Sequence, residues 1–167
     1  MSTPAFITEL RSLVGQRLLW LSSAIAVVLD DEGRVLLERR ADTGAWVLPG
    51  GIIDPAEQPA DAAVRECFEE TGVVAVPEAL TSVTVSEPIT YSNGDQTQYL
   101  ELTFRCQAVG GRARVNDAES LEVRWYALDA LPELDEGNLN RLTRALEYNG
   151  GTAYSFSGLA EVIGLPS

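Results

Sequence analysis

Apolar and polar residues recur along this chain with periods that change from segment to segment, and each period predicts an element. Residues 5–14 carry apolar side chains at helical spacing, which predicts a short N-terminal helix. Residues 18–29 are almost entirely apolar and predict a buried strand, and a turn at 30–33 leads into a second strand at 34–40. Further along we expect a short strand at 46–48, a helix at 58–71, strands at 73–86, 99–106 and 121–128, and helices at 137–148 and 157–163.

The order of these elements predicts the fold class. Helices and strands alternate without a regular βαβ repeat, so we expect an α/β fold in which helices pack on the faces of a mixed sheet. Asn93-Gly94 is typical of a hairpin turn before the strand at 99–106. The core-facing positions that we expect in this strand and in the helix at 137–148 are Leu100, Leu102, Phe104 and Cys106, and Leu139, Leu142, Ala145 and Leu146.

Length and charge narrow the classes of function. The chain has 167 residues, enough for a buried core, and we expect a single domain over residues 1–167 with a helical tail from about 137. It carries 12 basic and 25 acidic residues, a net charge of −13, and every basic residue is Arg. We therefore expect no nucleic-acid partner and no membrane partner. Because the chain has no His, acid–base and metal chemistry must use Asp, Glu, backbone oxygens or water.

The sequence also bears on the compartment. Residues 18–29 follow Arg11 and Arg17 in the manner of a signal peptide, but they lack a small-residue cleavage pattern and are too short to span a bilayer. Cys67 and Cys106 have no metal-type spacing and are expected to be buried free thiols. We therefore expect a cytoplasmic protein.

The helix at 58–71 has the clearest ends in the chain. Pro59 suits the first helical position and Gly72 suits the C-terminal cap. The helical wheel separates a carboxylate face from an apolar face, which we expect to pack on the sheet. The residues expected to make that packing face are Val64, Phe68 and Thr71.

The opposite face of this helix favours a cation site. Glu69 and Glu70 lie within about 60° of Glu66 on the wheel. Like charges at these spacings repel, and the last turn is the unfavourable end of the helix dipole for anions, so stability does not explain the cluster. Oxygen ligands without His or Cys select a hard ion, Mg²⁺ or Mn²⁺, which could assist attack of water on phosphorus. The alternative is a solvated acidic face that binds nothing.

A longer pattern surrounds these carboxylates. It runs from Gly51 through five residues to Glu57, then through seven residues to Arg65-Glu66, Cys67, one residue, Glu69-Glu70, one residue, Gly72 and Val73. This segment resembles the signature of the Nudix hydrolases, G-x5-E-x7-R-E-U-x-E-E-x-G-U. The only departure is Cys67, at a position that is usually aliphatic. The resemblance covers most of residues 20–130 and implies an α/β/α sandwich around a mixed sheet.

The resemblance implies roles for single residues. Glu66, Glu69 and Glu70 would bind the divalent ion, and Gly50 would supply a backbone oxygen. Arg65 would fix a carboxylate through a salt bridge. Glu57 would brace the loop that precedes the helix.

Many members of the family have a further Glu before a late strand, which serves as a ligand or as a base. The candidates here are Glu119 and Glu122, and we prefer Glu119 because the residues before it resemble a loop. Each could equally be a solvated acid. Arg39 and Arg40 follow a predicted strand and could face a phosphate, or could simply balance nearby acidic residues.

The resemblance also implies a small-molecule substrate, a nucleoside diphosphate linked to another group. In the family, a proline and a tyrosine beyond the signature are associated with ADP-ribose and with dinucleoside polyphosphates, and Pro88 and Tyr91 match both. We favour ADP-ribose-like substrates. Tyr91 and Trp46 could stack on a base, or could be packing residues. The alternatives are hydrolysis of nucleoside triphosphates and a module that binds nucleotides without turnover, and a homodimer remains open.

Overall fold

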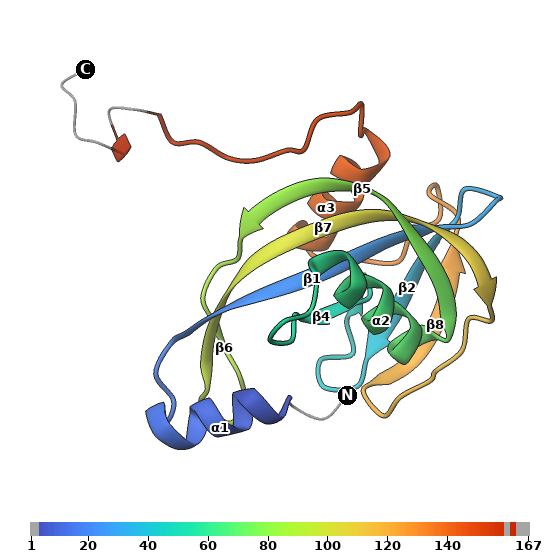
Figure 1. Ribbon diagram of the computed structural model, residues 1–167. Helices are drawn as coiled ribbons and strands as arrows, with labels where there is room; N and C mark the ends of the chain where they lie inside the picture. The colour runs from blue at the N-terminus through green and yellow to red at the C-terminus, as the bar shows by residue number, and fades with distance from the viewer. Residues whose placement is uncertain (1–3, 159–160, 163–167) are drawn as a thin grey trace.

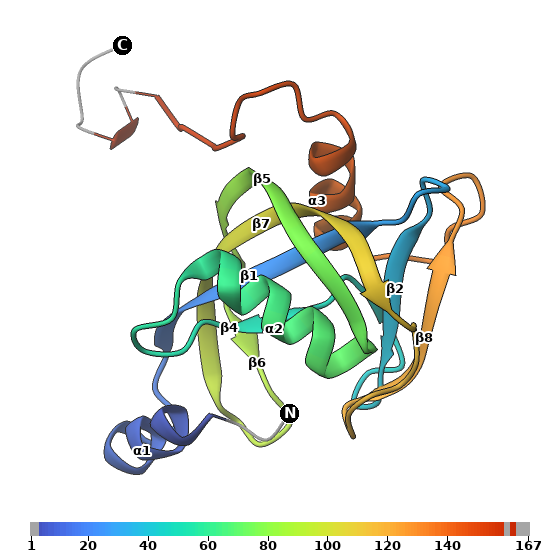
Figure 2. The ribbon, with the colours of Figure 1, turned by 45° about the vertical axis from the view of Figure 1, so that its right-hand side comes forward.

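The computed structural model describes residues 4–158 and 161–162. Its helices and strands are α1 (Ala5–Val14), β1 (Leu19–Leu29), β2 (Val35–Arg40), β3 (Trp46–Val47), β4 (Gly50–Ile52), α2 (Pro59–Thr71), β5 (Val73–Val85), β6 (Ile89–Thr90), β7 (Gln96–Gly111), β8 (Ser120–Tyr126) and α3 (Glu136–Leu146). Helices α2 and α3 cover opposite faces of one mixed sheet, and α1 lies beside the β6–β7 hairpin (Figures 1 and 2). The predicted α/β class is confirmed.

The sheet combines parallel and antiparallel pairs. Its main strand order is β3-β2-β1-β7-β5, with β4 paired to β1, β6 to β7 and β8 to β2. β1 runs parallel to β7 in unbroken register from the pair Leu19–Thr97 to the pair Leu29–Gln107. The β5–β7, β1–β4 and β2–β8 pairs are antiparallel.

The apolar run in β1 is buried because both faces of the strand are covered. Ala24, Ala26 and Val28 belong to the core cluster beneath α2, which also includes Cys67 and Cys106. The intervening residues of β1 belong to the cluster beneath α3, together with Leu142 and Ala145. A strand covered on both faces is continuously apolar, as the sequence indicated.

Some sequence-based expectations need correction. Leu139 does not belong to the packing face of α3, because its side chain is 48% exposed while Leu142 is 1% exposed. Strand β8 ends at Tyr126, before the expected residue 128. Trp46 packs edge-on against Tyr126, with the ring centroids 5.1 Å apart, and is therefore a packing residue. Residues 159, 160 and 163 of the helix expected at 157–163 lie outside the described residues.

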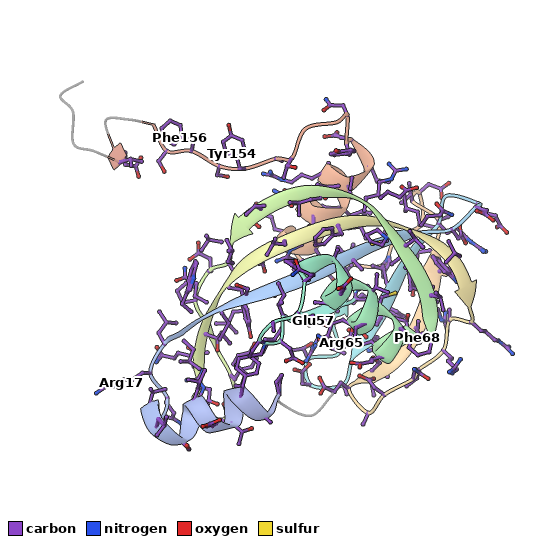
Figure 3. The ribbon with its side chains drawn as sticks, viewed as in Figure 1. Arg17, Glu57, Arg65, Phe68, Tyr154 and Phe156 are labelled. Carbon is purple, nitrogen blue, oxygen red and sulfur yellow. The ribbon has the colours of Figure 1, made fainter. Side chains whose placement is uncertain are left out.

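The chain after α3 returns to the free edge of the sheet. Ala153 lies parallel to Ser82 of β5, and its N–H donates to the carbonyl of Thr81 (2.9 Å) while its own carbonyl accepts from the N–H of Val83 (3.0 Å). The following residues run away from the sheet, and Tyr154 and Phe156 are exposed (Figure 3). Within the described part of the chain, no helix is long and apolar enough to cross a bilayer.

Candidate active site

Helix α2 turns two of its carboxylates, those of Glu66 and Glu70, toward the sheet. Pro59 occupies its first turn, and Gly72 ends it in the left-handed conformation at φ 69°. The buried residues of the helix are Ala62, Ala63, Glu66, Cys67, Glu70 and Thr71. The expected packing face was wrong in part, because Thr71 is buried but Phe68 is 46% exposed and Val64 is only half-buried. Small side chains at 62, 63 and 67 let α2 approach the sheet closely on the side that bears Glu66 and Glu70.

The glycine pair at the start of β4 accommodates these two carboxylates. Glu70 is 4% exposed, and one of its oxygens, Oε2, accepts a hydrogen bond from the N–H of Gly50 (3.0 Å). Glu66 is 2% exposed and lies against Gly51 so closely that a Cβ there would be 2.5 Å from the carboxylate. A side chain at Gly51 would therefore displace the carboxylate of Glu66.

Arg65 connects Glu57 with Glu66 and Glu69. Glu57 and Arg65 are labelled in Figure 3. Its Nε and Nη2 donate to the two carboxylate oxygens of Glu57, at 2.7 and 2.8 Å. Its Nη1 donates to Glu66 (2.8 Å) and to Glu69 (3.3 Å), and its Nη2 also donates to the carbonyl of Ile52 (3.2 Å). The hydrogen bonds from Arg65 hold the pKa of Glu57 below its usual value. The guanidinium thus joins α2 to the segment that leads into it.

Sequence reasoning missed a further buried acid, Glu38 of β2. Its side chain is 2% exposed, and Ser120 Oγ donates to its Oε2 at 2.6 Å. Burial raises the pKa of Glu38, and burial together with the charge of Glu38 raises the pKa of Glu70 well above its usual value. The strand period could have identified it. Glu38 lies two residues after Leu36, so both side chains are on the same face of β2, and that face packs beneath α2.

The electrostatics of this cluster suit a divalent cation. Burial raises the pKa of Glu66 to about 7, although Arg65 opposes the rise. The carboxyl groups of Glu38, Glu66 and Glu70 are thus buried where their ionised form is unfavourable, and a bound hard cation would stabilise the ionised form. The side chains are not yet arranged around a common point: among the described residues no group of three acidic or Cys side chains is placed to hold a metal ion. Glu66 and Glu69 turn to Arg65, whereas Glu70 turns to Gly50.

A pocket beside this cluster brings two more predicted residues together. Glu119 lies in the loop before β8, and its Oε2 is 3.8 Å from Nη2 of Arg40. Both residues line a pocket of about 380 Å³ together with Ala41, Asp42 and Ala118. Asp42 pairs with Arg40 at 2.9 Å, and the hydrogen bond to Asp42, with smaller contributions from Glu38 and Glu70, raises the pKa of Arg40.

The other predicted site residues lie elsewhere or face away. Arg39 is exposed and donates through Nε to the carbonyl of Gly44 (2.9 Å). Glu122 pairs with Arg124 within β8. Tyr91 lies at the hairpin between β6 and β7, where its hydroxyl is 2.9 Å from that of Tyr99. The structure therefore groups Arg40 and Glu119 with the carboxylates of α2, but not Tyr91.

Exchanging each glycine of β4 for Ala is expected to have different effects. In Gly51→Ala the three atoms nearest to the new Cβ all belong to the carboxylate end of the Glu66 side chain, so the protein should fold while Glu66 is displaced and turnover falls. In Gly50→Ala the Cβ would lie 2.5 Å from the carbonyl oxygen of Ala24 and 2.9 Å from Cα of Ile25, so the backbone of β1 must move and the melting temperature should fall. Thermal melts and steady-state kinetics of both variants test this, and full turnover by Gly51→Ala would contradict it.

Comparisons with known proteins agree with this geometry. A family model described as the NUDIX domain matches residues 20–146. A MutT-like protein of Streptomyces ambofaciens is 36% identical over 137 residues, which cover 81% of this chain and 83% of that protein. A putative 8-oxo-dGTP diphosphatase of Bacillus subtilis is 32% identical over 114 residues, covering 68% of this chain and 71% of that protein. An ADP-ribose pyrophosphatase of Methanocaldococcus jannaschii is 29% identical over 124 residues, covering 70% of this chain and 69% of that protein. The family model matches most of the length of this chain, and helix α2 places its carboxylates against a glycine pair. This chain therefore belongs to the Nudix hydrolase family.

Proposed function

We propose that this Nudix hydrolase cleaves a diphosphate bridge with the help of Mg²⁺ or Mn²⁺. The observation that carries the proposal is the buried face of α2, where Glu66 and Glu70 lie against the glycine pair of β4. Nudix hydrolases generally use divalent metal ions, and the donors present here are oxygens, which suit these hard cations. When bound, the ion would polarise a phosphate and lower the pKa of the attacking water.

The protein's own residues would hold the ion and orient the substrate. Glu66, Glu69 and Glu70 would bind the cation, with a backbone oxygen of Gly50. Arg65 would release Glu66 and Glu69 toward the ion while it stays anchored on Glu57. Arg40 in the neighbouring pocket would bind a phosphate of the substrate, because its guanidinium can engage two oxygens at once.

Glu119 would act as the base that takes a proton from the attacking water. It shares the pocket with Arg40, so a phosphate bound there would lie within reach of its carboxylate. The chain has no His that could take this role. A phosphate leaving group bound to a cation needs no general acid, which is why we propose cleavage between two phosphorus atoms and not hydrolysis of a phosphomonoester.

ADP-ribose-like compounds remain our preferred substrates, supported by the relative named as an ADP-ribose pyrophosphatase. Pro88 and Tyr91 do not separate them from dinucleoside polyphosphates. The relative named as a putative 8-oxo-dGTP diphosphatase favours a second candidate, hydrolysis of nucleoside triphosphates. ADP-ribose would give AMP and ribose 5-phosphate. A nucleoside triphosphate would give the monophosphate and pyrophosphate.

A reaction in ¹⁸O-labelled water is expected to place the label on a phosphate of one product. The test incubates the protein with ADP-ribose and with nucleoside triphosphates, including 8-oxo-dGTP, in Mg²⁺ or in Mn²⁺, and identifies the products by mass. Label on a sugar carbon, or inorganic phosphate released from a monoester, would refute cleavage of the diphosphate bridge. Tight binding without any turnover would instead indicate a binding module.

A further inference from the structure

The ladder between β2 and β8 contains a bulge next to the pocket. The pairs from Val35–Tyr126 to Arg39–Glu122 follow one antiparallel register. The next residue of β2, Arg40, lies opposite Ser120, so Leu121 is an extra residue in β8. Its side chain is 57% exposed. Bulges of this kind redirect the side chains that flank them.

Because of the bulge, Ser120 and not Leu121 lies opposite Arg40, on the face of the sheet that packs beneath α2. Paired residues of a sheet share a face, so Ser120 lies on the same face as Arg40 and, two residues away, Glu38. In an unbroken ladder the apolar side chain of Leu121 would occupy this position. Because of the bulge, the hydroxyl of Ser120 reaches Glu38, at 2.6 Å, from a position that is 6% exposed.

Three hydrogen bonds of the main chain act together with the side-chain bond between Ser120 and Glu38 to fix the backbone around Glu119. The carbonyl of Glu119 accepts from the N–H of Ala41 at 2.7 Å. Its N–H and that of Ser120 both donate to Oδ1 of Asp117, at 3.1 and 3.0 Å. The main chain is therefore fixed by hydrogen bonds on both sides of Glu119, whose carboxylate lines the pocket.

The same segment is fastened to the last turn of α2. The N–H of Asn116 donates to the carbonyl of Glu70 (3.2 Å), and its side-chain amide donates to the carbonyl of Phe68 (3.0 Å). The N–H of Arg114 donates to the carbonyl of Thr71 (3.0 Å). The bonds to Glu70 and Thr71 satisfy carbonyls that a helix end leaves without partners, whereas the carbonyl of Phe68 also accepts from the N–H of Gly72 (2.9 Å). They also connect the helix that bears Glu70 to the loop that bears Glu119.

We propose that Ser120 and Glu38 are positioning residues, which hold Glu119 at a fixed place relative to the carboxylates of α2. This inference rests on the proposed function, since it assigns a purpose to the placement of the base. Neither Ser120 nor Glu38 lines the pocket, and both are buried, so both act through Glu119. A displacement of about 1 Å at a reacting group can cost two orders of magnitude in rate, and a single hydrogen bond can control such a displacement.

The test is a double-mutant cycle of Ser120→Ala and Glu119→Gln. We expect Ser120→Ala to lower kcat about tenfold with little change in KM. In the Glu119→Gln background the same substitution should change kcat by less than about twofold, because residues that act as one unit are not additive. Ser120→Thr, which keeps the hydroxyl, should restore most of kcat.

A matched control separates positioning from loss of stability. Thr81 of β5 is 1% exposed and donates its hydroxyl to the carbonyl of Thr103 at 3.0 Å. Thr81→Val should lower the melting temperature much as Ser120→Ala does, but leave kcat unchanged in both backgrounds. The inference is overturned if Ser120→Ala leaves kcat unchanged, if it lowers kcat equally in both backgrounds, or if Glu119→Gln keeps full kcat. The third outcome would also remove Glu119 as the base, but none of the three removes the proposed cleavage of a diphosphate bridge, which depends on Glu70.

Discussion

Glu70→Gln is expected to abolish measurable turnover while the protein stays folded. Gln keeps the shape of Glu and can still accept the hydrogen bond from the N–H of Gly50. It cannot supply the anionic oxygen that Mg²⁺ or Mn²⁺ prefers, so we expect kcat to fall by about two orders of magnitude or more. At a pH where Glu70 is ionised, removing its buried charge beside Glu38 should also raise the melting temperature of the metal-free protein.

The matched control for this variant is Glu78→Gln. Glu78 is a partly exposed carboxylate of β5 that pairs with Arg105 at 3.1 Å, and nothing assigns it to the site. It should leave kcat unchanged and alter stability by little, because exposed ion pairs contribute about 0–1 kcal/mol. Near-normal turnover by a folded Glu70→Gln protein, at saturating cation, would refute the proposed metal site and with it the proposed function.

The melting temperature of the metal-free protein is expected to rise as pH falls from 8 to about 5.5. The folded-state pKa of Glu66 is raised by burial from 4.5 to about 7, and burial raises that of Glu70 as well. Between pH 4.5 and these raised values the folded protein binds protons that the unfolded chain has released, so its stability decreases as pH increases. For Glu66 alone the full shift corresponds to roughly 3 kcal/mol, of which about 2 kcal/mol falls between pH 5.5 and pH 8.

Divalent cations are expected to reverse this trend. An ion that binds only the folded state stabilises it by mass action, and it binds the deprotonated carboxylates. Mg²⁺ or Mn²⁺ should therefore raise the melting temperature strongly at pH 8 and weakly at pH 5.5. Thermal melts in EDTA and in millimolar cation at both pH values test the two statements. A larger metal shift at pH 5.5, or a metal-free protein that loses stability on acidification over this range, would contradict them.

The sequence predicts those features of the site that local residues control. The ends of α2 depend on the fixed φ of Pro59 and on the left-handed conformation of Gly72, so they can be located without knowledge of the fold. The close spacing of Glu66 and Glu70 on one face follows from helix geometry alone. The pocket partners Arg40 and Glu119 were candidates as well, but only the family resemblance singled out a Glu near 119.

Features that depend on distant strands could not be predicted in this way. A helical wheel gives the angles between side chains but not the side that will face the sheet, and so Phe68 was misplaced. The role of Glu38 depends on Ser120, which is far away in sequence, and on a bulge whose position no local pattern indicates. Leu139 was misplaced for a similar reason, because α3 contacts the sheet along a narrower stripe than its apolar residues occupy.

The parallel pairing of β1 with β7 has a consequence for how the chain folds. Every registered pair, from Leu19–Thr97 to Leu29–Gln107, joins residues that are 78 apart in sequence. Closing so long a loop costs entropy before the pairing contributes any stability, so topologies of this kind fold slowly. On the ribosome, the apolar β1 must wait for β7 to be synthesised before the central ladder can form. During that interval this apolar strand is exposed to aggregation, and a chaperone that binds extended apolar segments would protect it.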